Sequence, residues 1–477
     1  MNRAHHSTFG LLSALTLLGA GLAGCGSSAR ASRNVLRLPL YANRGRVVPG
    51  ILDPARATSA TPLLLTSLLH AGLVKFSTDL HVIPELAVSI PTITASGKTY
   101  TFTIRQDARF ADGRPCAATD VAYSFARALS PALHSNAARR YLGDIQGAAA
   151  VENGSTAVLR GVRALDRLTV RIRLTRPDAG FLDRLAFPAA DIVEPQTPAN
   201  RPGGMGPWAV SGITSGGGLI LRRRRHYFGG PLQVHELQLI PVASIKSAMD
   251  MYRKGTLDAV EIPFSEVASL DSNPDFHQST SLDAYYALPP RGGGSLLAAS
   301  LDRIRLVRKL PALSALTSIV PGTLPDYVSS SPVVSPVPSR KLAVRMEIPS
   351  HRTSALDALK ASIAKQWRES RSGIPVRLIH RYFSLPDPGR WLSLVLPQTT
   401  GTWMGRVLAQ ANRLTNDPVT RMSMYSKGEN WAISKGLIIP LASGTVSYLI
   451  KPAVSNLQAT PAGLMPENDN WVTVGMN

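Results

Sequence analysis

The sequence is poor in cysteine and in aromatic residues. It has 2 cysteines among 477 residues, and Phe, Trp and Tyr together make up 6% of the chain. Two cysteines exclude a scaffold held by several disulfides and a zinc site built from cysteine alone. Cys116 stands in no C-x-x-C context, so we expect an inert, small apolar residue there.

The motifs of the common enzyme classes are also missing. The sequence contains no G-x-S-x-G elbow, no H-E-x-x-H pair, no Walker loop and no dinucleotide-binding glycine pattern. Only His5-His6 among the 10 histidines show a metal-ligand spacing, and they lie in the predicted leader. We therefore predict no catalytic residue, no metal and no cofactor. A hydrolase with carboxylates facing each other across a cleft stays an open alternative.

Apolar residues, turn residues and positive charge are abundant. The hydrophobic content of 44%, with 38 Gly and 36 Pro, predicts a globular chain of about three structural units with many turns. The formal charge is +21, from 52 Lys and Arg against 31 Asp and Glu. This charge is spread along the chain, which favours contact with anionic lipid heads or wall polymers.

Four consecutive arginines, Arg222 to Arg225, form the most basic short feature. Tyr227 and Phe228 follow them, and single-stranded nucleic acid binders combine such basic runs with stacking aromatics. Arginines at the end of a strand are more typical of a solvated sheet edge that discourages strand pairing. We predict such an edge here and no nucleic-acid partner.

The first 24 residues have the form of a signal peptide. Arg3 is the only fixed charge before the uncharged stretch 7–24, which is marginal in length and composition for a membrane-spanning helix. Leu22-Ala23-Gly24-Cys25 resembles the bacterial lipobox, in which the cysteine is diacylated and begins the mature chain. We predict a signal peptide over 1–24, lipidation of Cys25 and a flexible tether over 25–34. An ordinary secretory signal is the alternative.

Several segments of the mature chain alternate with period two, as half-buried strands do. The segments 100–104 and 168–174 are examples. Between them we expect Thr119 to cap a helix that starts at Asp120 and stops before Pro131. The run Gly216 to Gly218 predicts a turn.

A βαβ unit is predicted in the second half of the chain. An alternating strand over 342–348 precedes a helix with Leu356, Leu359, Ile363 and Trp367 on one face, and a strand over 374–379 follows. The two strands should be parallel, with a right-handed crossover. The Ser/Pro/Val stretch 327–339 predicts a surface loop. We expect two α/β lobes rather than a barrel or a helical array.

Short blocks in a fixed order resemble the oligopeptide and dipeptide type of ABC-transporter solute-binding proteins, family 5. The resemblance runs from about residue 36 to residue 477. Its blocks are Leu52-Asp53-Pro54-Ala55, the segments 71–76 and 83–87, the stretch 98–121 with Asp112-Gly113-Arg114-Pro115, Gly206-Pro207-Trp208, Tyr227-Phe228-Gly229-Gly230-Pro231, the segment 254–258, and the segments 421–425 and 439–441.

The resemblance implies an α/β, two-lobed periplasmic-binding-protein-like fold of type II, in the enlarged peptide-binding class, with a hinge between the lobes. The chain would cross between them near 260–264 and 438–442. Lobe I would comprise 35–263, including a smaller subdomain over about 53–170, together with 441–477. Lobe II would comprise 264–440.

The function implied by this resemblance is capture of a solute outside the cytoplasm, at the periplasm or cell surface. A lipid-anchored monomer would bind a peptide or peptide-like small solute between its lobes and deliver it to ABC permease and ATPase subunits. One alternative is a surface receptor or envelope factor uncoupled from transport. A further alternative is an enzyme on the same scaffold.

Peptide-binding members of that family pair an aspartate in an ADYxDP segment with the ammonium of the ligand. Here Ser384 takes that place, and a hydroxyl cannot neutralise an ammonium. Asp387 could substitute, although an aspartate between two prolines is typical of a turn. Free-peptide capture is thus less favoured, and the basic balance would suit an anionic or neutral ligand at least as well. Candidate ligand contacts, each of which could also be core packing, are Tyr41, Trp208, Tyr285, Tyr286, Ser384, Asp387 and Trp391.

Overall fold

The computed structural model describes most of the chain beyond the leader. The described residues are 34–41, 52–94, 97–198, 203–214, 216–290, 292, 294–322, 324, 327, 341–350, 353–382, 386–396, 401–461, 463–466 and 471–476. The signal peptide, Cys25, the tether up to residue 33, Ser384 and the predicted loop beyond Tyr327 lie outside them. What was predicted for those residues stays a prediction.

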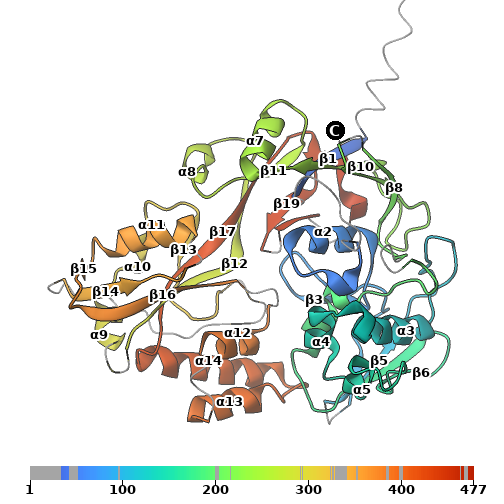
Figure 1. Ribbon diagram of the computed structural model, residues 1–477, viewed down its shortest axis with the longest axis horizontal. Coiled ribbons are helices and arrows are strands. Elements are labelled where there is room, and N and C mark those ends of the chain that lie inside the picture. Colours follow the sequence, from blue (N-terminus) through green and yellow to red (C-terminus); the bar gives the residue numbers. More distant parts are fainter. Residues whose placement is uncertain are drawn as a thin grey trace, which may run out of the picture.

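Two lobes lie side by side (Figure 1), which confirms the predicted two-lobed α/β architecture. Strands β12 (Phe276–Leu288) and β17 (Ile439–Ile450) run through one lobe, and helix α2 (Ala60–Leu69) and strand β5 (Thr99–Thr103) belong to the other. We use lobe I for residues 35–263 and 441–477 and lobe II for 264–440. These residue boundaries remain the predicted ones.

The first sheet of lobe I has four strands, and alternation explains its strand β1. Leu36, Leu38 and Leu40 are at most 2% exposed and point to one face. Strand β1 pairs in parallel with β10, and the other neighbours are antiparallel. Gly217, with φ of 82°, lies in the predicted turn, which joins β8 to β9. The strands in sheet order are β1 (Val35–Tyr41), β10 (Glu236–Val242), β9 (Leu219–Arg223) and β8 (Trp208–Ile213).

The prediction of a solvated edge at Arg222 to Arg225 is wrong. Strand β9 lies between β10 and β8, so both of its edges are paired. Arg223 donates from Nη1 to the carbonyl of Leu232, and Arg224 donates from Nη2 to the carbonyl of Gly204. The guanidinium groups therefore hold the neighbouring loops, because each supplies several donors for carbonyls that would otherwise be unsatisfied.

A smaller sheet with helices packed on it forms the rest of lobe I. Tyr100, Phe102, Val170 and Ile172 are at most 1% exposed, which confirms both alternating strands predicted here. The strands in sheet order are β4 (Thr92–Ile93), β5, β7 (Thr169–Arg173) and β6 (Val162–Ala164). The helices of this region are α3 (Ala118–Leu129), α4 (Asn136–Leu142), α5 (Ala148–Glu152) and α6 (Phe181–Leu185).

The predicted start of helix α3 is wrong by two residues, while its end before Pro131 is confirmed. The helix begins at Ala118, and Thr119 lies in its first turn. Asp120 accepts a hydrogen bond from the backbone N–H of Ala117 at 2.8 Å. The carboxylate at the third helical position thus bonds back to the N–H of the N-cap residue, and Thr119 is not the cap because it already lies within the helix.

Lobe II is built around a seven-stranded sheet, to which the segments assigned to lobe I contribute β11 and residues 441–450 of β17. Strands β14 and β16 are parallel with α11 between them, which confirms the predicted parallel βαβ unit. Trp367 lies beyond the end of α11 and is nevertheless fully buried. The strands in sheet order are β11 (Ala259–Glu261), β17, β12, β16 (Ile374–Tyr382), β14 (Ala343–Glu347) and β15 (Arg368–Glu369), with β13 (Leu313–Ala315) paired to β17.

The remaining elements flank these sheets. The other helices are α7 (Ile245–Arg253), α8 (Val267–Leu270), α9 (Gly294–Ala299), α10 (Arg303–Val307), α11 (Ser354–Ile363), α12 (Pro388–Val395), α13 (Trp403–Ala411) and α14 (Pro418–Ser434). The other strands are β2 (Val74–Phe76), β3 (Val82–Pro84), β18 (Val454–Ser455), β19 (Leu457–Thr460), β20 (Gly463–Pro466) and β21 (Gly475–Met476). Helices α12, α13 and α14 lie together at the bottom of lobe II (Figure 1).

Candidate functional site

A cavity of about 380 Å³ lies where the two lobes meet. Lobe I supplies most of its wall, from β1, α2, β2, β11, β20 and Trp471, and lobe II supplies Leu282, Tyr382 and Pro386. The volume is within the range of about 300–1,000 Å³ that is common for small-molecule sites. It suits a short or compact ligand rather than a long chain.

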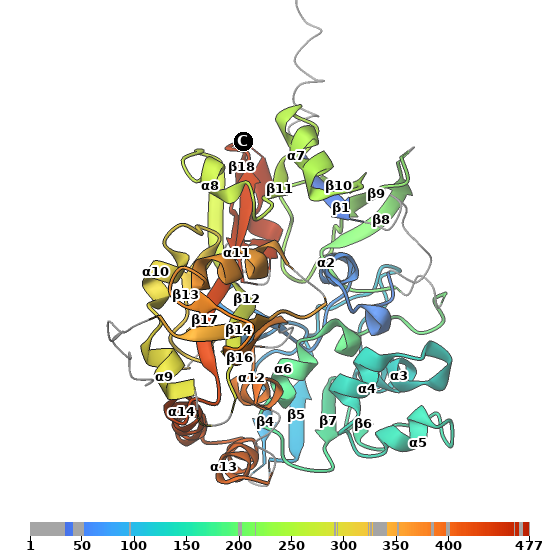
Figure 2. The same ribbon diagram turned by 60° about the vertical axis from the view of Figure 1, so that its left-hand side comes forward.

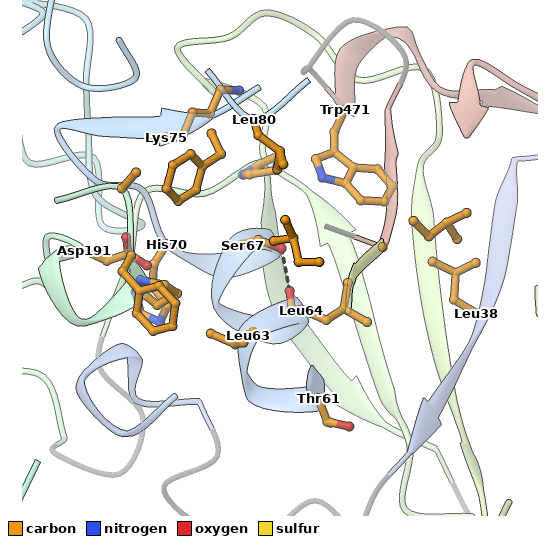
Figure 3. A pocket seen from close by; sticks show the side chains of 18 of the residues that line it. Leu38, Thr61, Leu63, Leu64, Ser67, His70, Lys75, Leu80, Asp191 and Trp471 are labelled. Carbon is orange, nitrogen blue, oxygen red and sulfur yellow. Dashed lines mark hydrogen bonds between the residues drawn. The ribbon is translucent and has the colours of Figure 1, made fainter. Parts of the chain in front are cut away.

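Helix α2 forms one side of the cavity. Its sequence is apolar all round, and leucines favour helix, so both faces can be buried. Leu65 and Leu68 are 0% exposed in the core of lobe I. Leu63 and Leu64 lie on the cavity side instead (Figure 3). The helix thus links the ligand wall directly to the hydrophobic core.

The opposite walls are apolar and aromatic. Trp471 and Leu80 face the cavity across from α2 (Figure 3), and Phe76 and Tyr227 also line it. Trp471 packs edge-to-face on the fully buried Trp208, with 6.3 Å between ring centroids. Such rings offer a ligand a large contact area at a small entropy cost.

Two carboxyl groups lie on either side of the backbone of Gly72. Glu85 accepts a hydrogen bond through Oε2 from the N–H of Gly72 at 2.8 Å. A Cβ atom placed on Gly72 would lie 3.2 Å from Oδ1 of Asp191. Burial raises the pKa of Glu85 to about 7, and the charge of Lys75 opposes this shift. Burial and then the charge of Glu85 raise the pKa of Asp191 well above its ordinary value.

His70 lines the same end of the cavity and lies beside Asp191 (Figure 3). It is 2% exposed, and its Nε2 is 3.0 Å from the carbonyl oxygen of Leu52. Burial lowers the pKa of His70 to about 4. The imidazole is therefore neutral at physiological pH and brings no positive charge to the two carboxyl groups.

A third carboxyl group, that of Glu261, lines the cavity near the crossing of the lobes. Burial, and secondarily the charge of Asp283, raise the pKa of Glu261. Burial and the charge of Glu261 likewise raise the pKa of Tyr41. The Tyr41 hydroxyl is buried and has no hydrogen-bond partner among the described residues. It is a polar group available to a ligand.

Of the predicted ligand contacts that the structure describes, Tyr41 lines the cavity and the others lie elsewhere. Trp208 supports Trp471 from behind. Tyr285 stacks on His380, with 4.8 Å between ring centroids, inside the sheet of lobe II. Trp391 donates through Nε1 to the hydroxyl of Tyr286 at 2.7 Å, and both side chains are fully buried in lobe II. The structure gives these four aromatics packing positions.

Asp387 is the N-cap of α12, as an aspartate before Pro-Gly would be. Its carboxylate accepts from the N–H groups of Gly389 at 2.9 Å and Arg390 at 3.4 Å. The neighbouring Pro386 lines the cavity, whereas Asp387 does not. Asp387 faces lobe I instead, where a Cβ on Gly180 would lie 2.5 Å from its Oδ2. Helices α6 and α12 meet at this point (Figure 2).

Sequence reasoning missed Glu85, Asp191 and Trp471. Glu85 stands within the block 83–87 that carries the resemblance, and it follows an apolar strand. Asp191 interrupts the apolar stretch 185–193. A lone acidic residue in an apolar stretch is the signal that could have pointed to both, because burying an unpaired carboxylate is costly.

Comparisons with known proteins show related sequences. Residues 81–298 match the model of the bacterial extracellular solute-binding proteins, family 5 Middle. Protein XP55 of Streptomyces lividans is 30% identical over 204 residues, which cover 41% of this chain and 35% of that protein. The periplasmic oligopeptide-binding protein OppA of Escherichia coli K12 is 28% identical over 235 residues, which cover 46% of this chain and 42% of that protein. The chain thus spans less than half the length of these curated relatives.

Solved structures resemble this fold over nearly its whole length. The murein tripeptide-binding protein MppA, in its unliganded open form, superposes with a TM-score of 0.75 at 19% identity, covering 93% of this chain and 96% of that one. HbpA2 from Haemophilus parasuis gives a TM-score of 0.74 at 16% identity, and the superposition covers 93% of this chain and 100% of HbpA2. These likenesses establish the fold.

Proposed function

This chain belongs to the family 5 extracellular solute-binding proteins of bacteria, and we propose that it is the substrate-binding component of an ABC importer. It captures a peptide or peptide-like small solute between its lobes and delivers it to a membrane permease served by ATPase subunits. The interlobe cavity of about 380 Å³ carries this proposal, since it combines apolar walls with a few polar groups.

The names of the relatives support a peptide-like solute. OppA of Escherichia coli is named as an oligopeptide-binding protein, and MppA of the same organism as a murein peptide-binding protein. These relatives are binding proteins rather than enzymes, in agreement with the prediction that the chain has no catalysis of its own. The cavity volume favours a short peptide or a compact analogue.

The anchor is the second part of the proposal. Diacylation of Cys25 would hold the mature chain at the outer face of the membrane, because several acyl chains together give lasting attachment. No helix in the described part of the chain is long and apolar enough to cross a bilayer. A tethered monomer would stay close to its permease while both lobes remain free to close.

The test uses the purified mature protein and a library of di- to pentapeptides in a thermal-shift screen, with hits confirmed by calorimetry. A ligand at 100 times its dissociation constant should add about 2.7 kcal/mol to the free energy of unfolding. Uptake of the hit is then compared in cells with and without the gene. Absence of any peptide-like ligand overturns the proposal, while binding without an uptake defect favours the uncoupled receptor.

A further inference from the structure

The cavity carries a charge opposite to that of the chain. The whole sequence has a formal charge of +21. The described residues of the cavity wall nevertheless include no arginine, and their carboxyl groups outnumber their ammonium groups: Glu85, Asp191 and Glu261 stand against Lys75. The basic balance of the whole chain would suit an anionic or neutral ligand at least as well as a peptide, whereas the local charges of the cavity favour a cation.

Asp191 is the most exceptional of these groups. Its carboxylate has no hydrogen bond or ion pair with any residue that the structure describes. The backbone of Gly72 lies close to it, and the neutral ring of His70 lies beside it (Figure 3). A partly buried carboxylate without a partner is costly, and it can be stabilised by a proton or by a cation from a ligand.

Glu85 lies on the other side of the same glycine. Among the described residues, its carboxylate accepts a hydrogen bond from the Gly72 N–H, which leaves acceptor capacity on a group with two oxygens. The charge of Lys75 lowers the pKa of Glu85, whereas the charge of Glu85 adds to burial in raising the pKa of Asp191. The single positive charge of Lys75 is therefore too small to neutralise the carboxylates of both Glu85 and Asp191.

A ligand ammonium matches this pair. An alkylammonium has three donors and can bridge two carboxylates, and its hydrogen bonds to them are charge-assisted. Phe76 and Tyr227 line the cavity as well, and aromatic faces attract cations. The leucines of α2 and Trp471 offer contact to an apolar body attached to that ammonium.

We propose, on the basis of the proposed binding function, that the cavity selects a solute in which a cationic nitrogen adjoins an apolar body. Glu85 and Asp191 of lobe I receive the nitrogen, and α2 with Trp471 receives the apolar body. A short peptide or peptide analogue with a free ammonium belongs to this class. Its N-acylated counterpart and organic anions do not.

The experiment compares three probes of similar shape by calorimetry at pH 8: 2-phenylethylammonium, neutral 3-phenylpropanamide and anionic 3-phenylpropanoate. The same titrations use Leu-Phe amide with a free ammonium and its N-acetyl form. Each probe is titrated into the wild-type protein, Glu85→Gln, Asp191→Asn and the double variant. Asp271→Asn is the matched control, because Asp271 is exposed and does not line the cavity.

We expect the cations to bind at least about tenfold more tightly than their neutral counterparts, and each neutralising variant to lose about tenfold in cation affinity. The affinity for the neutral probe should stay unchanged in the same variants, which shows that they are folded. Equal or tighter binding of the neutral or anionic probes overturns the inference. So does a cation preference that survives in the double variant.

The outcomes separate this inference from the proposed function. If peptides bind with no dependence on the charge of their amino terminus, the inference fails and the proposed function stands. If the simple ammonium probe binds through Glu85 and Asp191 but no peptide-like ligand does, the inference stands and the proposed function fails. If nothing in the set or in the peptide library binds, both fail.

Discussion

The backbone N–H of Ala179 in lobe I donates a hydrogen bond to the backbone carbonyl of Asn412 in lobe II, at 2.9 Å. Arg421 of lobe II donates through Nη1 to the carbonyl of Ala179 at 3.3 Å. The lobes are therefore in contact at a second place besides the pairing of β12 with β17. The N–H and the carbonyl of Ala179 are both hydrogen-bonded across this contact, so the two segments of the chain must approach closely.

Substitution of Gly180 tests how closely the two lobes must approach at this contact. Its φ of −87° suits any residue, but a Cβ there would lie 2.5 Å from Oδ2 of Asp387. We expect Gly180→Ala to push the lobes apart, at a cost of about 1–3 kcal/mol to the contact. Small-angle scattering should show a larger radius of gyration, and ligand affinity should fall by about tenfold.

Gly212→Ala is the control for that variant. Its Cβ would meet nothing closer than 3.8 Å, and it lies in β8, away from lobe II. It should leave the radius of gyration and the affinity unchanged. An unaltered radius of gyration in Gly180→Ala would show that the contact between α6 and α12 yields without separating the lobes.

The pKa of Glu85 has a consequence for stability. Burial raises it to about 7 from an ordinary value of 4.5, so the folded state binds this proton more tightly than the unfolded state. The resulting stabilisation is complete below about pH 4.5 and is lost as the pH rises through about 7. Between pH 4.5 and 7.5 the free energy of unfolding should fall by about 3 kcal/mol more in the wild type than in Glu85→Gln.

Urea unfolding at pH 4.5, 5.5, 6.5 and 7.5 measures this difference. Asp271→Asn, the same exposed control as above, should follow the wild type at each pH. Parallel pH profiles of the wild type and Glu85→Gln would contradict the prediction, because they would mean that Glu85 titrates at its ordinary pKa.

Tyr286 distinguishes a packing role from a ligand-binding role. Its hydroxyl donates to the carbonyl of Ile319 and accepts from Nε1 of Trp391. Tyr286→Phe should lower the free energy of unfolding by about 1–3 kcal/mol, because it leaves buried polar groups unsatisfied. Ligand affinity should not change. Denaturant melts and calorimetry check both, and a large loss of affinity with unchanged stability would place Tyr286 in the binding site.

Cys25 decides between a lipoprotein and an ordinary secreted protein. We expect the wild type to incorporate an alkyne-labelled fatty acid and to fractionate with membranes. Cys25→Ser should lose the label and leave the membrane fraction, because its attachment depends on the acyl chains. Cys116→Ser is the matched control. Cys116 is 1% exposed and burial raises its pKa to about 12, so it should carry no lipid. An unlabelled wild type would favour the secretory alternative.

Local patterns were enough for much of the fold. Alternation identified β5 and β7, and the spacing of apolar residues identified α11 within a parallel βαβ unit, since each pattern reports one buried face. The arginine run failed because a local pattern does not reveal that β9 has a neighbour on both sides. The predicted cap of α3 failed because the helix begins at Ala118, one residue before Thr119, and Asp120 bonds back to the N–H of Ala117.

The site was harder to predict than the fold. Tyr41 and Trp391 are both aromatic, and burial alone does not tell which of them faces a cavity and which faces the core. Glu85, Asp191 and Trp471 lie far apart in the sequence and line one cavity only once the distant segments of lobe I have folded together. Their shared role depends on packing between distant segments, which the periodicity of a local sequence does not reveal.

Strand β17 pairs with β12 of lobe II for most of its length and with β11 of lobe I at its end. Two register shifts interrupt its ladder with β12, at Thr280/Ala284 and at Tyr285/Tyr286. Bulges bend and twist a strand locally. Any rotation of one lobe about the other must therefore bend or twist β17, which is hydrogen-bonded to both β11 and β12. Because β17 resists twisting, the two lobes should favour one angle between them when no ligand is bound.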